Sequence, residues 1–377
     1  MSLTPETIRT ALQSLTDPLT GKDLASSVSS RGIHIEGGVV RLDVEVGYPV
    51  HGLRAELEAS IRALLFALPG VREVHCRVTG KIVAHATQTG AMQRLPEVRN
   101  IIAVASGKGG VGKSATAVNL ALALAMEGAR VGLLDADIHG PSLPQMLGLD
   151  GQRPVPEDDQ MRPLLAYGVQ VMSIGFLVEE NAPIIWRSPL VTRALFQLLH
   201  ETRWDNLDYL LVDMPPGTGD AQLSLAQQAP VVGAVMVTTP QDVALLDVRR
   251  GIRMFAKVGV RILGVVENMS FYVCPHCGRQ EAIFGAGGSE RLRAEFGVDC
   301  LGKLPLDTRI RAAGDSGRPI AIDAPEAPTA ILYRDIARQL AGRIAALPKD
   351  MRAKFPPIAI EPMPQRPGTQ DQEPGKT

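Results

Sequence analysis

The chain has 377 residues, of which 45% are hydrophobic and only 4% aromatic, and its formal net charge is -1. This length predicts one large α/β domain plus a smaller one, or two or three domains of ordinary size, and the aliphatic composition is typical of parallel sheets. The near-zero net charge gives no field to attract nucleic acid, and no apolar run reaches the roughly 18 residues of a membrane span. The first residues also lack a signal-peptide pattern. We therefore expect a cytoplasmic protein with neither nucleic acid nor membrane as a partner.

Residues 1–85 have the pattern of a small α+β domain. Apolar residues at helical spacing predict an amphipathic helix over about Gly52–Ala67. Alternation over Val39–Val46 predicts a half-buried strand, and Val71–Thr79 predicts another. Residues 86–99 are polar and lack periodicity, so we interpret them as a linker.

Between residues 100 and 347, short aliphatic runs alternate with helical patterns. This alternation predicts βαβ units, and therefore a mostly parallel sheet with helices on both faces. Ligands bind such sheets at the carboxyl ends of the strands. The runs are Ile101–Ala105, Val131–Leu134, Val169–Ile174, Tyr209–Val212, Ala234–Val237 and Ile262–Val266. Residues 348–377 are rich in Pro, Gln and charge, which predicts a disordered tail.

The most specific motif is a phosphate loop that follows the first of these runs and precedes an Ala-rich helix. Its glycines let backbone N–H groups approach phosphate oxygens, and the helix N-terminus adds positive potential. Lys113 is expected to bridge the β- and γ-phosphates and Ser114 to ligate Mg²⁺. The predicted ATP-binding residues of the loop are Gly107, Lys108, Gly109, Gly110, Val111, Gly112, Lys113 and Ser114.

The two lysines in Gly-Lys-Gly-Gly-Val-Gly-Lys-Ser make this loop similar to the deviant phosphate loop of nitrogenase iron protein, septum-site ATPases and partitioning ATPases. The resemblance implies that Lys108 reaches across a dimer to the partner's nucleotide, as an arginine finger does. Lys108 and Lys113 are therefore both predicted to be catalytic. The alternative for Lys108 is simple solvation.

Carboxylates follow two of the apolar runs. Asp135 and Asp137 come after Leu133-Leu134, and the resemblance places the family's first switch at Asp137. We predict that Asp137 is catalytic, orienting water or helping to hold Mg²⁺, while Asp135 is the alternative, with a structural role on the phosphate loop. Asp213 ends an aliphatic strand in the Walker B manner and is predicted to lie near Mg²⁺.

Two further segments complete the predicted nucleotide site. The Pro-Pro-Gly-Thr-Gly-Asp sequence of residues 215–220 fits a second switch that senses the γ-phosphate. Asn268 closes another strand, where the resembling family places an Asn that pairs with adenine, which implies ATP as the nucleotide. A simple strand-end turn is the alternative for Asn268.

The chain has four cysteines, two of them in Cys274-Pro275-His276-Cys277. A [4Fe–4S] cluster normally takes four thiolates, which two chains of a symmetric dimer can supply together. A dimer-shared Zn²⁺, a thioredoxin-type redox pair and a structural turn are the alternatives. Cys76 and Cys300 are predicted to be buried apolar residues. His276 is predicted to be exposed, and His139 to be solvated or a helix cap.

With this cysteine loop, residues 100–346 resemble the Mrp/ApbC group of iron–sulfur cluster carrier ATPases, and residues 1–85 resemble a small domain that this group shares with assembly factors. Some versions of that domain carry a cysteine where this chain has Gly47-Tyr48-Pro49-Val50-His51, so a cysteine-dependent role of the domain is not expected. The resemblance implies a homodimer that hydrolyses ATP slowly, binds a [4Fe–4S] cluster bridging its two subunits, and transfers it to apo iron–sulfur proteins, with cluster assembly factors as further partners. The rival interpretation is a positioning or partitioning ATPase with a dimer-shared structural zinc.

Overall fold

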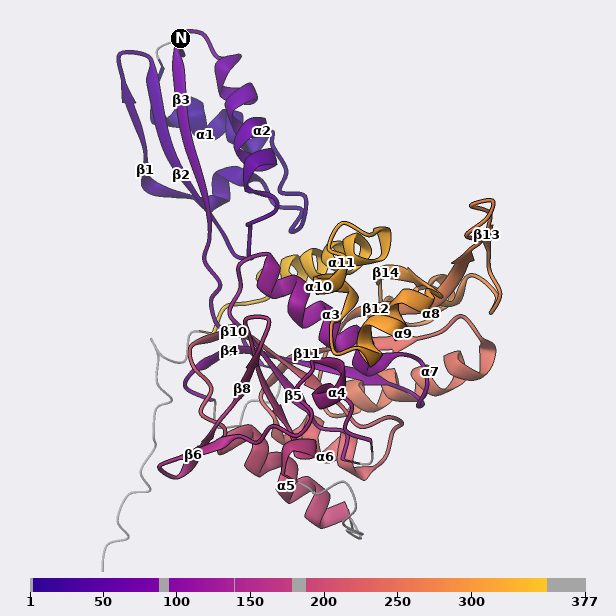
Figure 1. Cartoon of the computed structure of the whole chain (residues 1–377). Coiled ribbons are helices and arrows are strands. Elements are labelled where there is room, and N and C mark those ends of the chain that lie inside the picture. The colour runs from indigo at the N-terminus through magenta and orange to yellow at the C-terminus, as the bar shows by residue number, and fades with distance from the viewer. Residues whose placement is uncertain (1–2, 88–94, 139, 178–187, 351–377) are drawn as a thin grey trace, which may run out of the picture.

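The computed structural model describes residues 3–87, 95–138, 140–177 and 188–350 (Figure 1). Its N-terminal unit is a mixed sheet of three strands with two helices on one face. Strand β2 pairs antiparallel with β1 and parallel with β3, and every second side chain of β2 is buried. The elements are α1 (Pro5–Gln13), β1 (Val28–Glu36), β2 (Val39–Val46), α2 (Arg54–Phe66) and β3 (Glu73–Gly80), with a short 3₁₀ helix at Leu24–Ser27. The predicted α+β character of this unit is confirmed.

The larger part of the chain is built on a nine-stranded sheet, as far as the structure describes it, in the order β13-β12-β11-β4-β10-β5-β9-β8 with β14 beside β12. Pairing is parallel from β14 through β9, and only β8 and β13 join antiparallel. The strands are β4 (Val98–Ser106), β5 (Val131–Asp135), β8 (Leu164–Ala166), β9 (Val169–Ser173), β10 (Leu207–Asp213), β11 (Val231–Thr238), β12 (Ile262–Val273), β13 (Gln280–Glu281) and β14 (Cys300–Pro305). Every residue of β10 and β11 is buried, because helices cover both faces.

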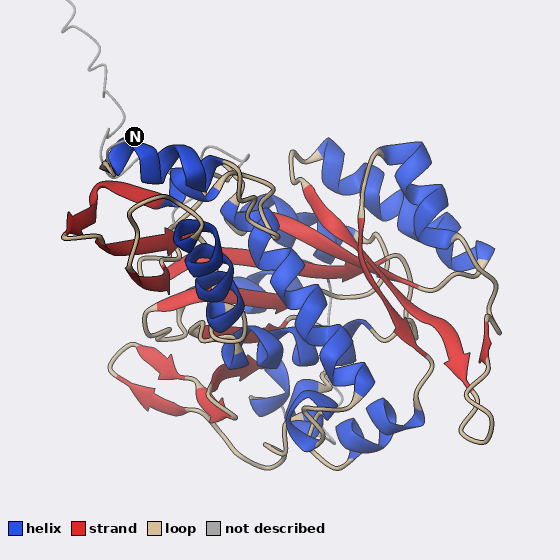
Figure 2. Cartoon of the chain, turned by 90° about the horizontal axis from the view of Figure 1, so that it is seen from above, coloured by secondary structure: helices blue, strands red, loops and turns tan. Residues whose placement is uncertain are grey.

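Helices α3, α10 and α11 lie on one face of this sheet, and α5, α6 and α7 lie on the other (Figures 1 and 2). Their bounds are α3 (Lys113–Met126), α10 (Ile320–Asp323), α11 (Pro328–Ala345), α5 (Ser188–His200), α6 (Asp220–Gln228) and α7 (Asp242–Lys257). The remaining elements are α4 (Leu143–Met146), α8 (Gly288–Phe296), α9 (Thr308–Asp315), the small hairpin β6 (Val155–Glu157) and β7 (Gln160–Arg162), and a 3₁₀ helix at Ile174–Phe176. The predicted α/β fold, with a mostly parallel sheet between helices, is confirmed.

The structure shifts two of the predicted boundaries. Strand β4 begins at Val98, inside the stretch 86–99 expected to be a linker. The first residues of the expected tail are paired with the end of the N-terminal unit: the Ala86 N–H donates to the Pro348 carbonyl and the Asp350 N–H to the Ala84 carbonyl, both at 2.9 Å. Backbone pairing of this kind leaves no trace in side-chain composition. The rest of the expected tail, 351–377, lies outside the described residues.

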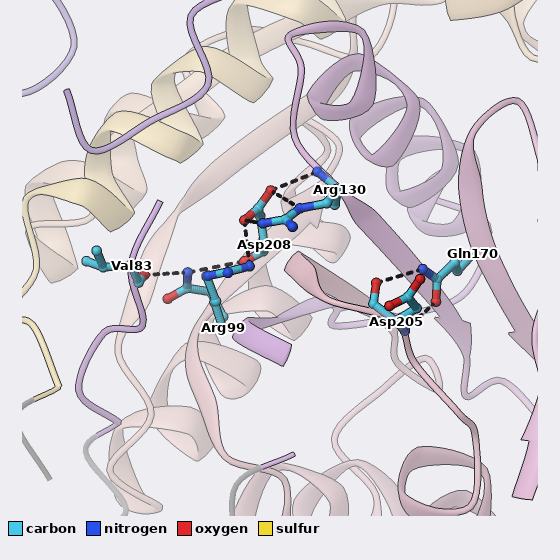
Figure 3. Close-up of polar contacts among 7 residues, drawn as sticks. Val83, Arg99, Arg130, Gln170, Asp205 and Asp208 are labelled. Carbon is cyan, nitrogen blue, oxygen red and sulfur yellow. Dashed lines mark hydrogen bonds and ion pairs between the residues drawn. The ribbon is translucent and has the colours of Figure 1, made fainter. Parts of the chain in front are cut away.

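A buried carboxylate fixes the amino edge of the sheet, where β10 starts (Figure 3). Asp208 accepts bonds from Arg99 Nη1 at 2.9 Å and from the Arg130 backbone N–H and Nη2, both at 2.9 Å. Beside it, Asn100 Nδ2 donates to the Val83 carbonyl at 2.9 Å, which attaches the segment leaving the N-terminal unit to β4. This network joins β4, β5 and β10 at the end of the sheet remote from the phosphate loop.

The N-terminal unit is also joined to the far end of α3 through Glu127, which is 2% exposed. The Glu127 carboxylate accepts the Gly52 N–H at 2.9 Å and Arg338 Nη2 of α11 at 2.6 Å, and its carbonyl accepts the His51 N–H at 3.0 Å. A Cβ at Gly52 would lie 2.2 Å from Arg338 Nη2, so a larger residue there would have to displace the Arg338 guanidinium from this contact. The helix that starts at the phosphate loop therefore ends against the N-terminal unit.

Candidate nucleotide and metal site

The phosphate loop connects the carboxyl end of β4 to α3. Gly110 and Gly112 both have φ near +79°, a left-handed conformation that costs glycine little, and Gly112 caps α3. A Cβ at Gly112 would lie 2.3 Å from Asn268 Nδ2, and one at Gly107 would lie 2.3 Å from the Asp247 backbone carbon. The loop therefore needs glycine both for its turns and for the close approach of β12 and α7.

Lys113 lies at the first position of α3, with its ammonium among carboxylates. Its Nζ is 2.6 Å from Asp213 Oδ1 and 3.9 Å from Asp137 Oδ2, and both Lys113 and Asp213 are buried. Asp213 ends β10 directly beside Asp135 at the end of β5. The structure thus brings together Lys113, Asp137 and Asp213, three residues predicted from separate segments.

Asp135 uses both of its carboxylate oxygens to hold neighbouring loops. Oδ1 accepts the Asp137 N–H at 3.1 Å, and Oδ2 accepts the Leu143 N–H at 3.3 Å and the Ser173 hydroxyl at 3.1 Å. Burial, and then the neighbouring charge of Asp213, raise the pKa of Asp135 to about 7. Asp137 keeps its own carboxylate facing Lys113. This arrangement suits Asp135 to a structural role and Asp137 to contact with the nucleotide.

The residues predicted to hold Mg²⁺ have the chemistry that the ion requires. Asp213 is fully buried, and its Oδ2 makes no hydrogen bond within the described part of the chain. Burial raises the pKa of Asp213, and the Lys113 ammonium counteracts this effect. The Asp213 carboxylate and the Ser114 hydroxyl that interacts with it are oxygen ligands of the kind that Mg²⁺ prefers.

Lys108 lies half-buried in the same loop, where its carbonyl accepts the Ser106 hydroxyl at 2.9 Å. For its ammonium no hydrogen bond or ion pair is found with the residues that the structure describes. The adjoining α7 exposes two apolar side chains, Val243 at 61% and Leu246 at 53%. Among the described residues, an ammonium without an ion-pair partner on the loop and an exposed apolar surface on the helix packed against Gly107 are thus both available for contact.

Asn268 lies in β12 beside a cavity of about 260 Å³ next to the phosphate loop. Its Nδ2 donates to the Val111 carbonyl at 2.9 Å, and its Oδ1 accepts the Met269 N–H at 2.9 Å. The cavity is lined by residues of β12, of α3 and of the segment after β14, among them Ala115, Met269, Leu306 and Ile310. Its size and apolar walls suit a planar base.

Cys274 and Cys277 lie in a turn between β12 and β13, which projects from the sheet (Figure 1). The Cys274 N–H donates to the Arg279 carbonyl and the Gly278 N–H to the Cys274 carbonyl, both at 2.9 Å, which closes the turn. Cys274 is partly exposed, and Cys277 and His276 are exposed. No group of three or more His, Cys, Asp or Glu residues suited to a metal ion occurs in the part of the chain that the structure describes.

The turn also lowers the pKa of the Cys274 thiol. The backbone N–H groups of Cys277 and then of His276 donate to its sulfur and stabilise the thiolate. In metal-free protein we therefore expect alkylation of Cys274 to reach half its maximal rate at a lower pH than alkylation of the same cysteine in the unfolded chain. Peptide mass spectrometry across a pH series measures this. Cys277→Ser keeps the backbone donor, so the midpoint of Cys274 should stay lowered in this variant, and a midpoint no lower than that of the unfolded chain contradicts the assignment.

The other two cysteines differ from each other. Cys76 is buried in β3 at 9% exposure, and burial raises its pKa to about 12. Cys300 is only half-buried, and its thiol donates to the Gly302 carbonyl. The predicted burial of Cys300 is therefore incomplete, because β14 lies at the side of the sheet. His139 lies outside the described residues.

Sequence reasoning missed several residues that shape the site. Ser173, at the end of β9, holds Asp135, and the segment after β14 lines the base-sized cavity. The rule that ligands lie beyond strand carboxyl ends could have found Ser173, at the end of a predicted run, and also the segment after β14, had β14 been recognised as a strand. Glu267, buried at 1% exposure beside Asn268, was also missed, because a single acidic residue in a strand carries no motif.

Comparison with known proteins agrees with this geometry. Residues 97–341 match the NUBPL iron-transfer P-loop NTPase family, and residues 5–76 match the iron–sulfur cluster assembly protein family. An iron–sulfur cluster carrier protein of Escherichia coli K12 is 49% identical over 308 residues, 81% of this chain and 82% of its own length. The iron–sulfur cluster transfer protein NUBPL of Mus musculus is 51% identical over 254 residues, 67% of this chain and 80% of its own.

Among solved structures, a nucleotide-binding protein from Archaeoglobus fulgidus in complex with ADP is similar, with a TM-score of 0.56 and 38% identity. The match covers 63% of this chain and 93% of that one. In the described part of this chain, no helix is both long and apolar enough to cross a membrane. The family matches and the relatives confirm the predicted family: the chain belongs to the NUBPL iron-transfer P-loop NTPases and is a homologue of the Mrp/ApbC iron–sulfur cluster carriers.

Proposed function

We propose that this protein is an ATP-hydrolysing homodimer that carries a [4Fe–4S] cluster and transfers it to apo iron–sulfur proteins. One observation carries the proposal. Strand β12 presents Asn268 at the phosphate loop and then continues to Val273, directly before Cys274. One strand therefore connects the phosphate loop, through Asn268, to the turn that carries the two cysteines. The names of the relatives, which are cluster carrier and transfer proteins, support the same cargo.

The site is proposed to be completed by a second copy of the chain. Each chain contributes Cys274 and Cys277, so two chains supply the four thiolates of one bridging cluster. The exposed position of the turn permits such sharing. ATP and Mg²⁺ would lie between the subunits, bound by Lys113, Ser114 and Asp213 of one chain, with Lys108 of the partner subunit reaching the phosphates.

Anaerobic reconstitution with iron and sulfide tests the cargo. We expect about two iron and two sulfide per chain, the content of one [4Fe–4S] cluster per dimer, and transfer of that cluster to an apo-ferredoxin. The protein as isolated from zinc-containing medium is the parallel sample. Half an equivalent of zinc per chain, with no iron uptake, would instead identify a dimer-shared structural zinc and refute the carrier role.

Mixed dimers test whether Lys108 acts across the interface. Lys108→Ala and Lys113→Ala homodimers are each expected to be nearly inactive ATPases. When equal amounts of the two variants are combined and their subunits exchange, half of the dimers contain one chain of each variant. In each such dimer, one of the two nucleotide sites has Lys113 of its own chain and Lys108 of the partner chain. Activity should therefore return to about a quarter of the wild-type value. If Lys108 served the nucleotide of its own chain, the mixture would stay inactive.

A further inference from the structure

Strand β12 bends sharply between the nucleotide site and the cysteines. Met269 has φ +54°, a left-handed conformation that is uncommon and strained for a side chain of its size. The pairing of β12 with β14 also shifts in register between Glu267 and Phe271. Before the bend the strand pairs with β11 and β14, and beyond it Phe271 still pairs with Pro305 of β14 before Tyr272 and Val273 pair with β13. The direction of the cysteine turn is therefore set at Met269.

A single buried carboxylate, that of Glu267, holds this bend on both sides. Its Oε1 accepts the hydroxyl of Ser270, just beyond the bend, and its Oε2 accepts the backbone N–H of Ser289 at 2.5 Å. Ser289 lies in the first turn of α8, where the chain returns from the cysteine turn and where the helix dipole favours an anion. A Cβ at Gly288 would lie 2.7 Å from Oε2, so the return path fits closely against the carboxylate.

The charge of Glu267 has little other compensation. The side chain is 1% exposed, and the cation beside it, Lys303 Nζ, lies 3.8 Å from Oε1 and closer, at 2.7 Å, to Glu290. A carboxylate buried this deeply is costly unless hydrogen bonds satisfy it. The segment that carries Cys274 and Cys277 is therefore bound to the Glu267 carboxylate at both of its ends, at Ser270 and at Ser289.

The next residue in the chain contacts the nucleotide loop. Asn268 donates to the Val111 carbonyl, and Asn268 and Met269 both line the base-sized cavity. Asn268 Nδ2 has a second N–H besides the one that Val111 accepts, so a base that bonds this N–H pulls on the same side chain. Any resulting movement of Asn268 or Met269 reaches Glu267 and Ser270, because they are the immediate chain neighbours.

We infer that Glu267 is a positioning residue that transmits nucleotide binding at the phosphate loop to the geometry of Cys274 and Cys277. It does so by holding the bend of β12 and the start of α8 as one unit. This inference rests on the proposed function, which assigns nucleotide binding to the phosphate loop and cluster binding to the two cysteines. The coupling itself does not require a bound cluster, so the reactivity of the two thiols is enough to test it.

The test compares alkylation rates of Cys274 and Cys277 in metal-free protein, with and without a non-hydrolysable Mg-ATP analogue, at one fixed pH. In the wild type we expect the analogue to change the rate by about fivefold or more, the lower range of ordinary allosteric coupling. Glu267→Met keeps the length of the side chain but accepts no hydrogen bond. In this variant the ratio of the alkylation rates with and without the analogue should lie within about twofold of one, although the analogue still binds.

Controls separate coupling from simple destabilisation. Glu290→Gln alters the exposed neighbour that shares Lys303, and it should keep the wild-type ratio. If Glu267→Met does not fold, Ser270→Ala, which removes only the tie across the bend, should reduce the ratio in the same direction. The inference is overturned if the alkylation rates of the wild type with and without the analogue are nearly equal. It is also overturned if the Glu267 or the Ser270 variant responds to the analogue as strongly as the wild type does. Failure of wild-type reconstitution would instead refute the carrier role.

Discussion

Replacing Lys113 by alanine is expected to lower ATP turnover by about two to three orders of magnitude, the usual cost of removing a preorganised charge donor at the transition state. The structure adds a second expected effect. Lys113 Nζ lies 2.6 Å from the fully buried Asp213 carboxylate, which the variant leaves without its cation. Breaking a buried pair in this way costs about 3 kcal/mol of folding free energy. Steady-state phosphate release and denaturant unfolding without added nucleotide measure the two effects.

A double variant separates these effects. Lys113→Ala with Asp213→Asn removes both charges, so most of the lost folding stability should return while ATP turnover stays low. Lys81→Ala is a matched control, because Lys81 is an exposed lysine paired with Glu45 in the N-terminal unit. If the double variant were no more stable than the single one, the ion pair would not be the source of the instability.

Cys274→Ser and Cys277→Ser, singly or together, are each expected to abolish stable cluster binding, because either change leaves a dimer with at most two of the four thiolates. The brown colour and the iron content after anaerobic reconstitution should both fall to background. ATP turnover measured without iron should change little, since neither cysteine lines the base cavity or contacts Lys113.

Cys300→Ser is the matched control for that experiment. Cys300 is half-buried, lies on β14, and donates to the Gly302 carbonyl, a bond that a serine hydroxyl can also make. It should retain full cluster content. Loss of the cluster in this variant to the same degree would mean that the ligands are not confined to the Cys-x-x-Cys turn.

The sequence was sufficient to predict the central buried strands of the large domain. The runs at β4, β5, β10 and β11 are buried on both faces, so each reads as a short block of aliphatic residues. Strands β8 and β13 were not predicted, because they are only three and two residues long and lie at the sheet's edges. The extension of β12 to Val273 was missed because its polar bend, Glu267 to Ser270, interrupts the apolar pattern.

The candidate site was predicted residue by residue, but not its contacts. Motif spacing identified Lys113, Asp213 and Asn268 individually, since each ends or follows an apolar run. Their pairing depends on strand order: β4 lies beside β10, which brings Lys113 and Asp213 together across 100 positions of sequence. The ties of Glu267 to Ser289 and of Glu127 to Gly52 join residues without any motif. Only the folded chain reveals them.

The contact between Gly52 and Glu127 offers a way to study the N-terminal unit inside the intact protein. Because a single Cβ at position 52 would lie 2.2 Å from Arg338 Nη2, the smallest possible substitution must displace the Arg338 guanidinium at this contact. Gly52 is not part of the hydrophobic core, and the phosphate loop is at the opposite end of α3. A one-methyl change can thus loosen the attachment of the two parts without deleting either, which a truncated chain cannot do.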